Sequence, residues 1–276
     1  MIAAVAGGVG YSEWEPTERS VPAPPLSGVH GVISFDALMK TEPFIHKGRT
    51  VTWRIAPGLA KFLDDTVRPG HATLETGSGL STLVITRRRP TRHISIAPDP
   101  GEFEAIRELL EAHEVDATPL EEVVGRSQDY LPTAALPPLD LVLIDGDHSF
   151  PAPFMDWYFT ADRLKVGGLM IVDDIDIVTG TMLVDFMRAD PKWEEILRPP
   201  LERYAVYRKV RHPIHDDIWM QQPYLKDAYR TRALKILRRS DRRDGPISLI
   251  ERIMARILPW RLIQVPLRRR FDWPRS

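Results

Sequence analysis

The chain has 276 residues, of which 43% are hydrophobic and 27% charged, and it contains no cysteine. This composition is typical of a folded globular protein, and the length suits one α/β domain with extensions. It excludes disulfides and thiolate metal sites, and no apolar run reaches the roughly 18–20 residues of a membrane span. Met1–Gly10 has no basic flank typical of a signal peptide, so a cytoplasmic location is expected.

The formal net charge of −1 conceals two oppositely charged parts. Residues 226–276 contain 15 Lys and Arg against 5 Asp and Glu, so this tail is basic and the rest of the chain is acidic. The acidic body and the basic tail are therefore interpreted separately. Arginine outnumbers lysine by 29 to 8. Such an excess is associated with bacterial genomes of high GC content.

The first 30 residues are rich in proline and polar residues, which predicts an irregular arm. Gly31–Lys40 could form a short helix or turn, and apolar spacing predicts a helix within Arg54–Val67. On these grounds we divide the chain into an N-terminal arm (1–50), an α/β domain (51–212) and a basic, partly helical extension (213–276).

A strand, a glycine turn and a helix are predicted in succession after residue 70. The β-prone run His71–Leu74 ends at Glu75, and the turn Gly77-Ser78-Gly79 precedes residues at helical spacing. Glycines let the backbone turn tightly and come close to a nucleotide, although an ordinary tight turn is an equal alternative. Thr82 stands where a dinucleotide fingerprint has its third glycine, which disfavours a dehydrogenase.

Strands and helices continue to alternate over about 140 residues, which predicts an α/β fold with a doubly wound, mostly parallel, Rossmann-like sheet. Helices are predicted at Glu102–His113, Pro151–Leu164 and Thr181–Arg188. Strands are predicted at Arg92–Ala97, Glu121–Val124, Leu139–Ile144 and Leu169–Val172, with a closing antiparallel pair at Trp193–Leu197 and Tyr204–Val210.

Ligands of such sheets bind at the carboxyl ends of the strands, so the residues after each strand are the candidates for a site. All five turns carry carboxylates, although aspartate is common in turns. The turns are Glu75–Gly79, Ala97–Asp99, Gly125–Asp129, Asp145–His148 and Asp173-Asp174.

The run of motifs over about Ala72–Val210 resembles the class I S-adenosylmethionine-dependent methyltransferases. Glu75-Thr76-Gly77-Ser78-Gly79 is similar to their first motif, whose loop wraps the methionine part and the ribose of the cofactor. The resemblance implies S-adenosylmethionine as the cofactor. The cofactor-binding residues expected on this basis are Glu75, Gly77, Ser78, Gly79, Thr82, Asp99, Ser127, Gln128 and Asp145.

Two further segments, Val124–Asp129 and Leu143–His148, are similar to parts of catechol O-methyltransferase and other metal-dependent O-methyltransferases. By this resemblance Ser127 and Gln128 contact the adenine. The resemblance also implies Mg²⁺ or another divalent cation, held by Asp145, Asp173 and Asp174. The expected reaction is metal-assisted O-methylation of a small-molecule hydroxyl.

Two positions depart from the family pattern. The acid that binds both ribose hydroxyls at the end of the second strand is replaced by Ala97, with Asp99 two residues later. Either Asp99 reaches the ribose through a changed turn, or the affinity for the cofactor is reduced. The catalytic lysine of the catechol enzymes is replaced by His148.

Methyl transfer mainly requires that donor and acceptor be held in line. An oxygen acceptor must also lose its proton, and a bound Mg²⁺ lowers the acceptor's pKa and prefers oxygen ligands. We therefore expect Asp145 to act as a catalytic metal ligand. His148 is the candidate general base, because an imidazole with a pKa of about 6.5 suits proton abstraction near neutrality.

Each candidate also has a plainer interpretation. Asp145 and Asp173-Asp174 could be turn or capping aspartates, and Glu75 could be an acid bonded to loop amides. His148 could be a metal ligand or a helix cap. The whole chain could be a non-catalytic binding protein with a methyltransferase fold, which Ala97 favours.

The basic tail contains an amphipathic segment, Pro246–Arg261, with apolar residues on one face. Such a helix lies on an anionic membrane surface or packs on its own domain or on a second subunit, and we prefer packing, which would allow a homo-oligomer. No nucleic-acid reader motif is present, so no nucleic-acid partner is expected. The expected partner is a small-molecule acceptor.

Overall fold

The computed structural model describes residues 33–40, 55–215 and 222–226. Most of the N-terminal arm and of the basic extension, including Pro246–Arg261, lies outside these described residues. The predicted domain boundaries at residues 50 and 212 therefore stay predictions. Among the described residues, no helix combines the length and apolar composition needed to cross a bilayer.

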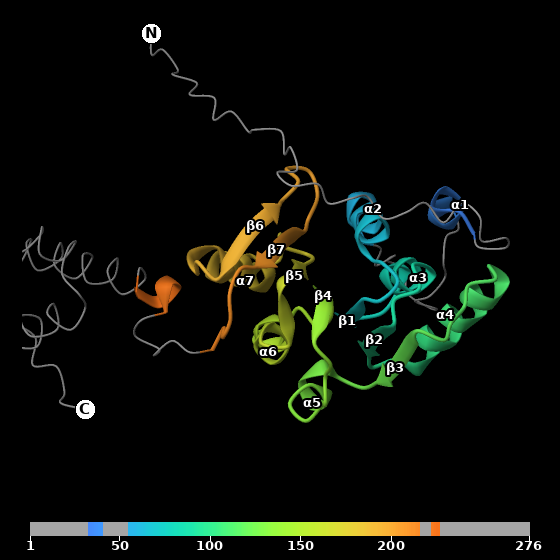
Figure 1. The fold of residues 1–276 in the computed structure, drawn as a ribbon, viewed down its shortest axis with the longest axis horizontal. Helices are drawn as coiled ribbons and strands as arrows, with labels where there is room; N and C mark the ends of the chain where they lie inside the picture. Colours follow the sequence, from blue (N-terminus) through green and yellow to red (C-terminus); the bar gives the residue numbers. More distant parts are fainter. Residues whose placement is uncertain (1–32, 41–54, 216–221, 227–276) are drawn as a thin grey trace, which may run out of the picture.

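The described chain alternates strands and helices as predicted (Figure 1). The helices are α1 (Phe35–Lys40), α2 (Pro57–Thr66), α3 (Leu80–Arg87), α4 (Pro100–Ala112), α5 (Ser127–Tyr130), α6 (Ala152–Ala161) and α7 (Val178–Ala189). The strands are β1 (Ala72–Thr76), β2 (Arg92–Ala97), β3 (Leu120–Val124), β4 (Leu139–Ile144), β5 (Leu164–Val172), β6 (Trp193–Leu197) and β7 (Ala205–Lys209).

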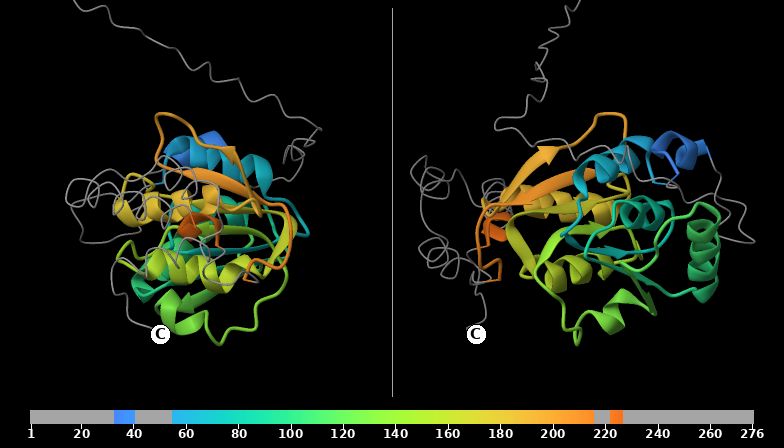
Figure 2. Two further views of the ribbon diagram at one scale, coloured as in Figure 1. Left: turned by 90° about the vertical axis from the view of Figure 1, so that its left-hand side faces the viewer. Right: turned by 45° about the vertical axis from the view of Figure 1, so that its right-hand side comes forward.

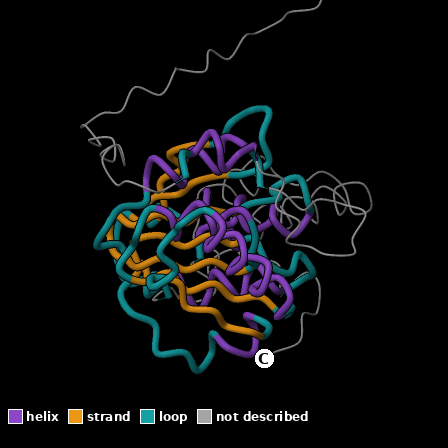
Figure 3. The backbone as a smooth tube through the Cα atoms, turned by 90° about the vertical axis from the view of Figure 1, so that its right-hand side faces the viewer, coloured by secondary structure: helices purple, strands orange, loops and turns teal. Residues whose placement is uncertain are grey.

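The strands form one seven-stranded sheet in the order β3-β2-β1-β4-β5-β7-β6 (Figure 1). Figure 3 shows the strands of this sheet in orange. Strands β1 to β5 pair in parallel, and β7 pairs antiparallel with both β5 and β6. The predicted fold class, including the closing antiparallel pair, is confirmed. The order reverses between β1 and β4, so the switch point at which ligands bind in such folds lies beside the glycine turn.

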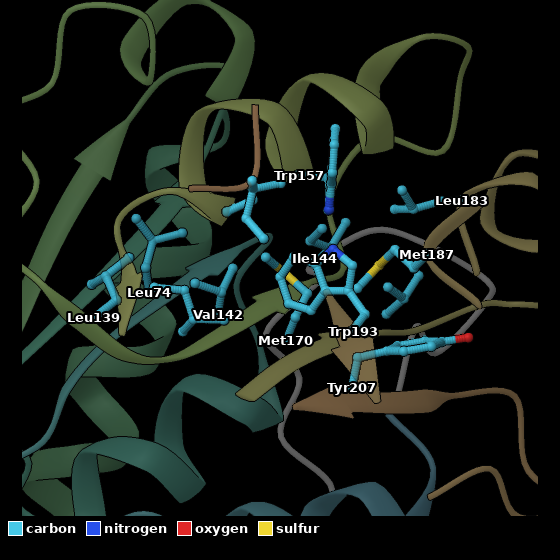
Figure 4. Close-up of a cluster of buried hydrophobic side chains, with 14 of the residues drawn as sticks. Leu74, Leu139, Val142, Ile144, Trp157, Met170, Leu183, Met187, Trp193 and Tyr207 are labelled. Atoms are coloured by element: carbon cyan, nitrogen blue, oxygen red, sulfur yellow. The ribbon is translucent and has the colours of Figure 1, made fainter. Parts of the chain in front are cut away.

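Helices cover both faces of the sheet (Figure 2). Strand β4 supplies both cores because alternate side chains point to opposite faces. Val142 and Ile144 pack with α6 and α7, in the cluster that Figure 4 shows, while Leu141 and Leu143 pack with α2, α3 and α4. A sheet buried on both faces explains why β4 is a continuous apolar run.

Three elements, α5, α6 and β5, differ clearly from the sequence-based expectation. Helix α6 ends at Ala161 instead of Leu164, and Leu164 begins β5, where it pairs with Leu139. Strand pairing takes over at this point, because the amide of Leu139 donates to the carbonyl of Arg163 (2.8 Å). Nζ of Lys209 donates hydrogen bonds to the carbonyls of Ala161 (2.7 Å) and Leu164 (2.6 Å) on either side of the junction. The short helix α5 was not predicted, because four residues carry too little periodicity.

Candidate active site

The turns that follow β1 to β5 surround one cavity of about 740 Å³ at the carboxyl edge of the sheet. Hydrogen bonds between strand ends hold these turns together. The amide of Asp145 donates to the carbonyl of Thr76 (3.1 Å), and the amide of Asp173 donates to the carbonyl of Ile144 (3.0 Å). The acidic residues after β4 and β5 are thereby fixed beside the glycine turn after β1.

Gly77 is the residue of the glycine turn that packs directly against the backbone of Asp145. Its φ is +93°, a conformation that favours glycine, and its amide donates to the carbonyl of Ile96 (2.8 Å). A Cβ at this position would collide with the backbone carbonyl of Asp145. The close approach of β1 to β4 therefore requires glycine here, and Gly77 and Ser78 both line the cavity.

Behind the turn, a buried hydrogen-bond network supports its shape. The Thr82 hydroxyl donates to Oε1 of Glu75 and accepts from the amide of Gly79 (3.0 Å). His93 on β2 lies with Nε2 3.2 Å from the same Glu75 oxygen and with Nδ1 2.9 Å from the Thr73 hydroxyl. Glu75, Gly79 and Thr82 thus shape the turn and do not form the cavity wall.

One atom of this network lacks a partner. Oε2 of Glu75 is buried and makes no hydrogen bond to any of the described residues. Buried carboxylate oxygens are almost always satisfied, so this orphan acceptor is an exception among the described residues. Because Glu75 lies behind the cavity wall, its predicted contact with the cofactor stays a prediction.

The loop after β3 forms one end of the cavity. Ser127 and Gln128, at the start of α5, both line it. Asp156 of α6 is 1% exposed, neither of its carboxyl oxygens hydrogen-bonds to a described residue, and burial raises the pKa of the carboxyl to about 6, with the nearby Ser127 and Thr76 acting in the opposite direction. Asp156 thus lies near the loop after β3, which is predicted to contact the adenine.

The segment between β2 and α4 carries two carboxylates with different surroundings. Asp99 is exposed and is the N-cap of α4, with its Oδ1 accepting from the amide of Gly101 (2.9 Å). Glu102 is 8% exposed, and its Oε2 accepts from the Ser78 hydroxyl (2.8 Å). Asp99, Glu102 and Ala97 all line the cavity.

The opposite end of the cavity is acidic. Asp145, His148 and Asp174 each offer a ligand atom, and these atoms lie within 4.8 Å of one another. Asp173, which was predicted as the third ligand, also lines the cavity but is not part of this group. Asp174 has a φ of +48°, a conformation uncommon outside glycine that clusters at functional sites.

The electrostatics of this acidic group favour a bound cation. Burial, together with the charges of Asp173 and Asp174, raises the pKa of Asp145 well above its usual range. Burial likewise raises the pKa of Asp173 to about 6. The hydrogen bond from His148 lowers the pKa of Asp174, and the same bond raises the pKa of His148. A nearby cation would stabilise the ionised carboxylates, and oxygen and imidazole ligands suit a divalent metal.

Sequence patterns did not identify three residues of this region. Arg203, whose Nη1 lies 3.2 Å from Oδ1 of Asp174, comes from the loop before β7 and has no motif around it. His93 looked like an ordinary strand residue. Glu102 had one signal, an acid in the first turn of a helix, and this signal also fits simple helix stabilisation. His148 does not cap α6, because no side-chain bond caps that helix.

Comparison with known proteins finds one matching family profile and several solved structures with a similar fold. Residues 74–175 match the profile of a family described as a methyltransferase domain. The fold resembles cofactor-bound Rv0187 from MTB, with 21% identity, a TM-score of 0.53, and coverage of 67% of this chain and 94% of that chain. It also resembles an O-methyltransferase from Bacillus cereus in complex with SAH, with 16% identity, a TM-score of 0.51 and coverage of 64% and 90%. No curated protein sequence matches the chain.

Proposed function

We propose that this chain, a class I S-adenosylmethionine-dependent methyltransferase, methylates a hydroxyl oxygen of a small molecule with the help of a divalent cation. The observation that carries the proposal is the single cavity that contains both the glycine turn and the cluster of Asp145, His148 and Asp174. A methyl donor bound at the turn and an acceptor bound at the cluster would meet in this one cavity.

Residues along the cavity wall suit the adenine and the methionine part of S-adenosylmethionine, which supplies an electrophilic methyl group when bound. Ser127 and Gln128 are proposed to hold the adenine, and the backbone of Gly77 and Ser78 is proposed to hold the methionine part. Because the glycines of the turn have no side chains, a ligand can lie directly against the backbone of the turn.

The acidic cluster is proposed to bind the cation and the acceptor. Asp145, Asp174 and His148 would hold a divalent ion, with Asp173 beside them, and such an ion lowers the pKa of a hydroxyl that it contacts. His148 is the candidate base for the acceptor proton when it is not itself a ligand. Its bond to Asp174 (3.0 Å) fixes the imidazole toward the cluster.

Turnover assays test the proposal directly. The full chain is incubated with S-adenosylmethionine and a panel of catechols, other phenols and sugar alcohols, and S-adenosylhomocysteine formation is measured with EDTA and after Mg²⁺ is restored. We expect turnover on at least one hydroxyl acceptor, loss of turnover in EDTA and recovery with Mg²⁺. Full activity in EDTA would remove the metal from the proposal.

Ala97 supports a second candidate, a binding protein of this fold without catalysis, because the usual ribose-binding acid is missing. Calorimetry with S-adenosylhomocysteine comes first. If millimolar S-adenosylhomocysteine gives no heat of binding, the enzyme proposal is wrong. Binding without turnover on any acceptor of the panel would favour the second candidate.

A further inference from the structure

Glu102 is a buried carboxylate at the cavity wall that no part of the mechanism above uses. It is 8% exposed and lies in the first turn of α4, where the helix dipole favours a negative charge. The Ser78 hydroxyl donates to its Oε2 (2.8 Å), so the glycine turn after β1 holds the carboxylate in place. Both residues line the cavity.

The position of Glu102 along the wall indicates which part of a nucleotide it faces. Strand β2 lies between β3, whose loop carries Ser127 and Gln128, and β1 with its glycine turn. A nucleoside that reaches from the β3 loop to the glycine turn passes its ribose over the end of β2. In nucleotide-binding folds of this kind, an acid near the end of the second strand accepts hydrogen bonds from the ribose hydroxyls.

The two other residues at this position do not provide a buried acid. Ala97 has no polar side chain, and Asp99 is exposed with its Oδ1 engaged by the amide of Gly101 (2.9 Å). Glu102 approaches the same region from the helix instead of the strand, because Ser78 draws its carboxylate toward the glycine turn.

We propose that Glu102 replaces the missing strand-end acid and accepts hydrogen bonds from the ribose hydroxyls of S-adenosylmethionine, with Ser78 as the residue that positions it. This inference rests on the proposed function and names a residue that the cofactor contacts. It also accounts for Ala97, because a second carboxylate next to Glu102 would add charge repulsion without a further hydroxyl to bind.

Calorimetry with the full chain tests the inference without any acceptor. The probes are S-adenosylhomocysteine, 5′-methylthioadenosine, which lacks the amino-acid part, and the 2′-deoxy and 3′-deoxy forms of both. The variant is Glu102→Gln, which keeps an oxygen for the Ser78 hydroxyl. The matched control is Glu104→Gln, the same change at an exposed position of α4.

We expect Glu102→Gln to weaken both S-adenosylhomocysteine and 5′-methylthioadenosine by about 10- to 100-fold, the usual loss of a hydrogen bond to a charged acceptor. Removal of a ribose hydroxyl should weaken binding to the wild-type chain and to Glu104→Gln, but should add little in Glu102→Gln. Thermal melting confirms that each variant is folded. If Glu102→Gln does not fold, Glu102→Asp, which keeps the charge and shortens its reach, should show the same loss of discrimination.

Three results would overturn the inference. One is equal discrimination between ribose and deoxyribose in wild type and Glu102→Gln. Another is weaker binding of S-adenosylhomocysteine but not of 5′-methylthioadenosine, which would place Glu102 at the amino-acid part. The third is a loss of ribose discrimination in Asp99→Asn alone. If the wild-type chain binds neither S-adenosylhomocysteine nor 5′-methylthioadenosine, the proposed function is also wrong. If the wild-type chain binds them normally and one of the three results is found, only the role of Glu102 is wrong.

Discussion

Nε2 of His148 lies 3.0 Å from Oδ2 of Asp174, and this contact joins the turn after β4 to the turn after β5. The Thr179 hydroxyl at the start of α7 reinforces the connection by donating to the backbone carbonyl of His148 (2.6 Å). Both the side chain and the backbone of His148 are therefore held by the β5–α7 segment. A histidine held in this way is oriented before any ligand arrives.

Replacement of His148 by alanine should lower turnover by roughly 10²–10⁴, the usual range for a positioned general base. The dissociation constant of S-adenosylhomocysteine should change little, because His148 belongs to the acidic cluster with Asp145 and Asp174, whereas the adenine is proposed to contact Ser127 and Gln128. Steady-state kinetics and calorimetry measure the two quantities. His215→Ala is the control, because His215 stacks on Tyr158 and is not part of the cavity wall. Normal turnover in His148→Ala would leave proton removal to the metal alone.

Asp174→Asn should abolish the binding of Mn²⁺, used as a probe for the divalent site. The substitution removes a charge from the cluster of Asp145, His148 and Asp174. In the wild-type chain, Mn²⁺ at 100 times its Kd should stabilise the fold by about 2.7 kcal/mol, which appears as a rise in Tm. Asp176→Asn, a change at an exposed carboxylate two residues away, should keep the shift. An equal rise in Tm for Asp174→Asn and wild type would argue against the site.

Gly77→Ala should prevent cofactor binding. It should also lower the free energy of unfolding by more than the cost of placing an alanine at positive φ. Gly70 provides a matched control, because its φ of +92° nearly equals the +93° of Gly77, but a Cβ there meets no atom within 4 Å. Gly70→Ala should cost about 1–2 kcal/mol of unfolding free energy, the price of a left-handed alanine. Gly77→Ala adds the collision with Asp145. Urea unfolding compares the two variants, and equal losses would refute the close approach of β1 to β4.

Asp156→Asn should make the chain more stable at neutral pH. Burial raises the pKa of Asp156 to about 6 from a reference value near 3.8. The folded chain therefore binds more protons than the unfolded chain between these values, so this carboxyl lowers stability as the pH rises from about 4 to 6. The loss at pH 7 is on the order of 3 kcal/mol.

Urea unfolding of Asp156→Asn and wild type at pH 4 and pH 7 measures this contribution. The variant should gain stability relative to wild type between the two pH values, while Asp145 and Asp173 titrate in both proteins and cancel in the comparison to first order. The same difference in unfolding free energy at both pH values would show that Asp156 is not the titrating group.

The fold was largely predictable because its signals are local. Continuous apolar runs marked β4 and the later part of β5, since strands buried on both faces need apolar residues throughout. The prediction failed where a distant residue decided the outcome. Leu139 pairs with Leu164, and Lys209 binds the carbonyls of Ala161, where α6 ends, and of Leu164, where β5 begins; no pattern within residues 151–164 contains that information.

The candidate site was predictable only as a set of positions. Parallel strands bring their carboxyl ends to one edge, so Asp145, Asp173 and Asp174 were expected near the glycine turn. Their individual surroundings were not foreseen. Asp174 pairs with His148, Asp173 lies outside that cluster, and Glu75 supports the turn from behind the cavity wall.

The sequence alone determined the alternation of elements, the glycine at residue 77 and the absence of an acid at residue 97, because these depend on backbone conformation and residue type. Only the tertiary structure decided which side chains meet. The bond between Ser78 and Glu102 joins the turn after β1 to the first turn of α4, and it exists because the β1–β2 crossover brings those two segments together. Hydrogen bonds act over about 3 Å, so residues 24 positions apart interact only after the fold has placed them.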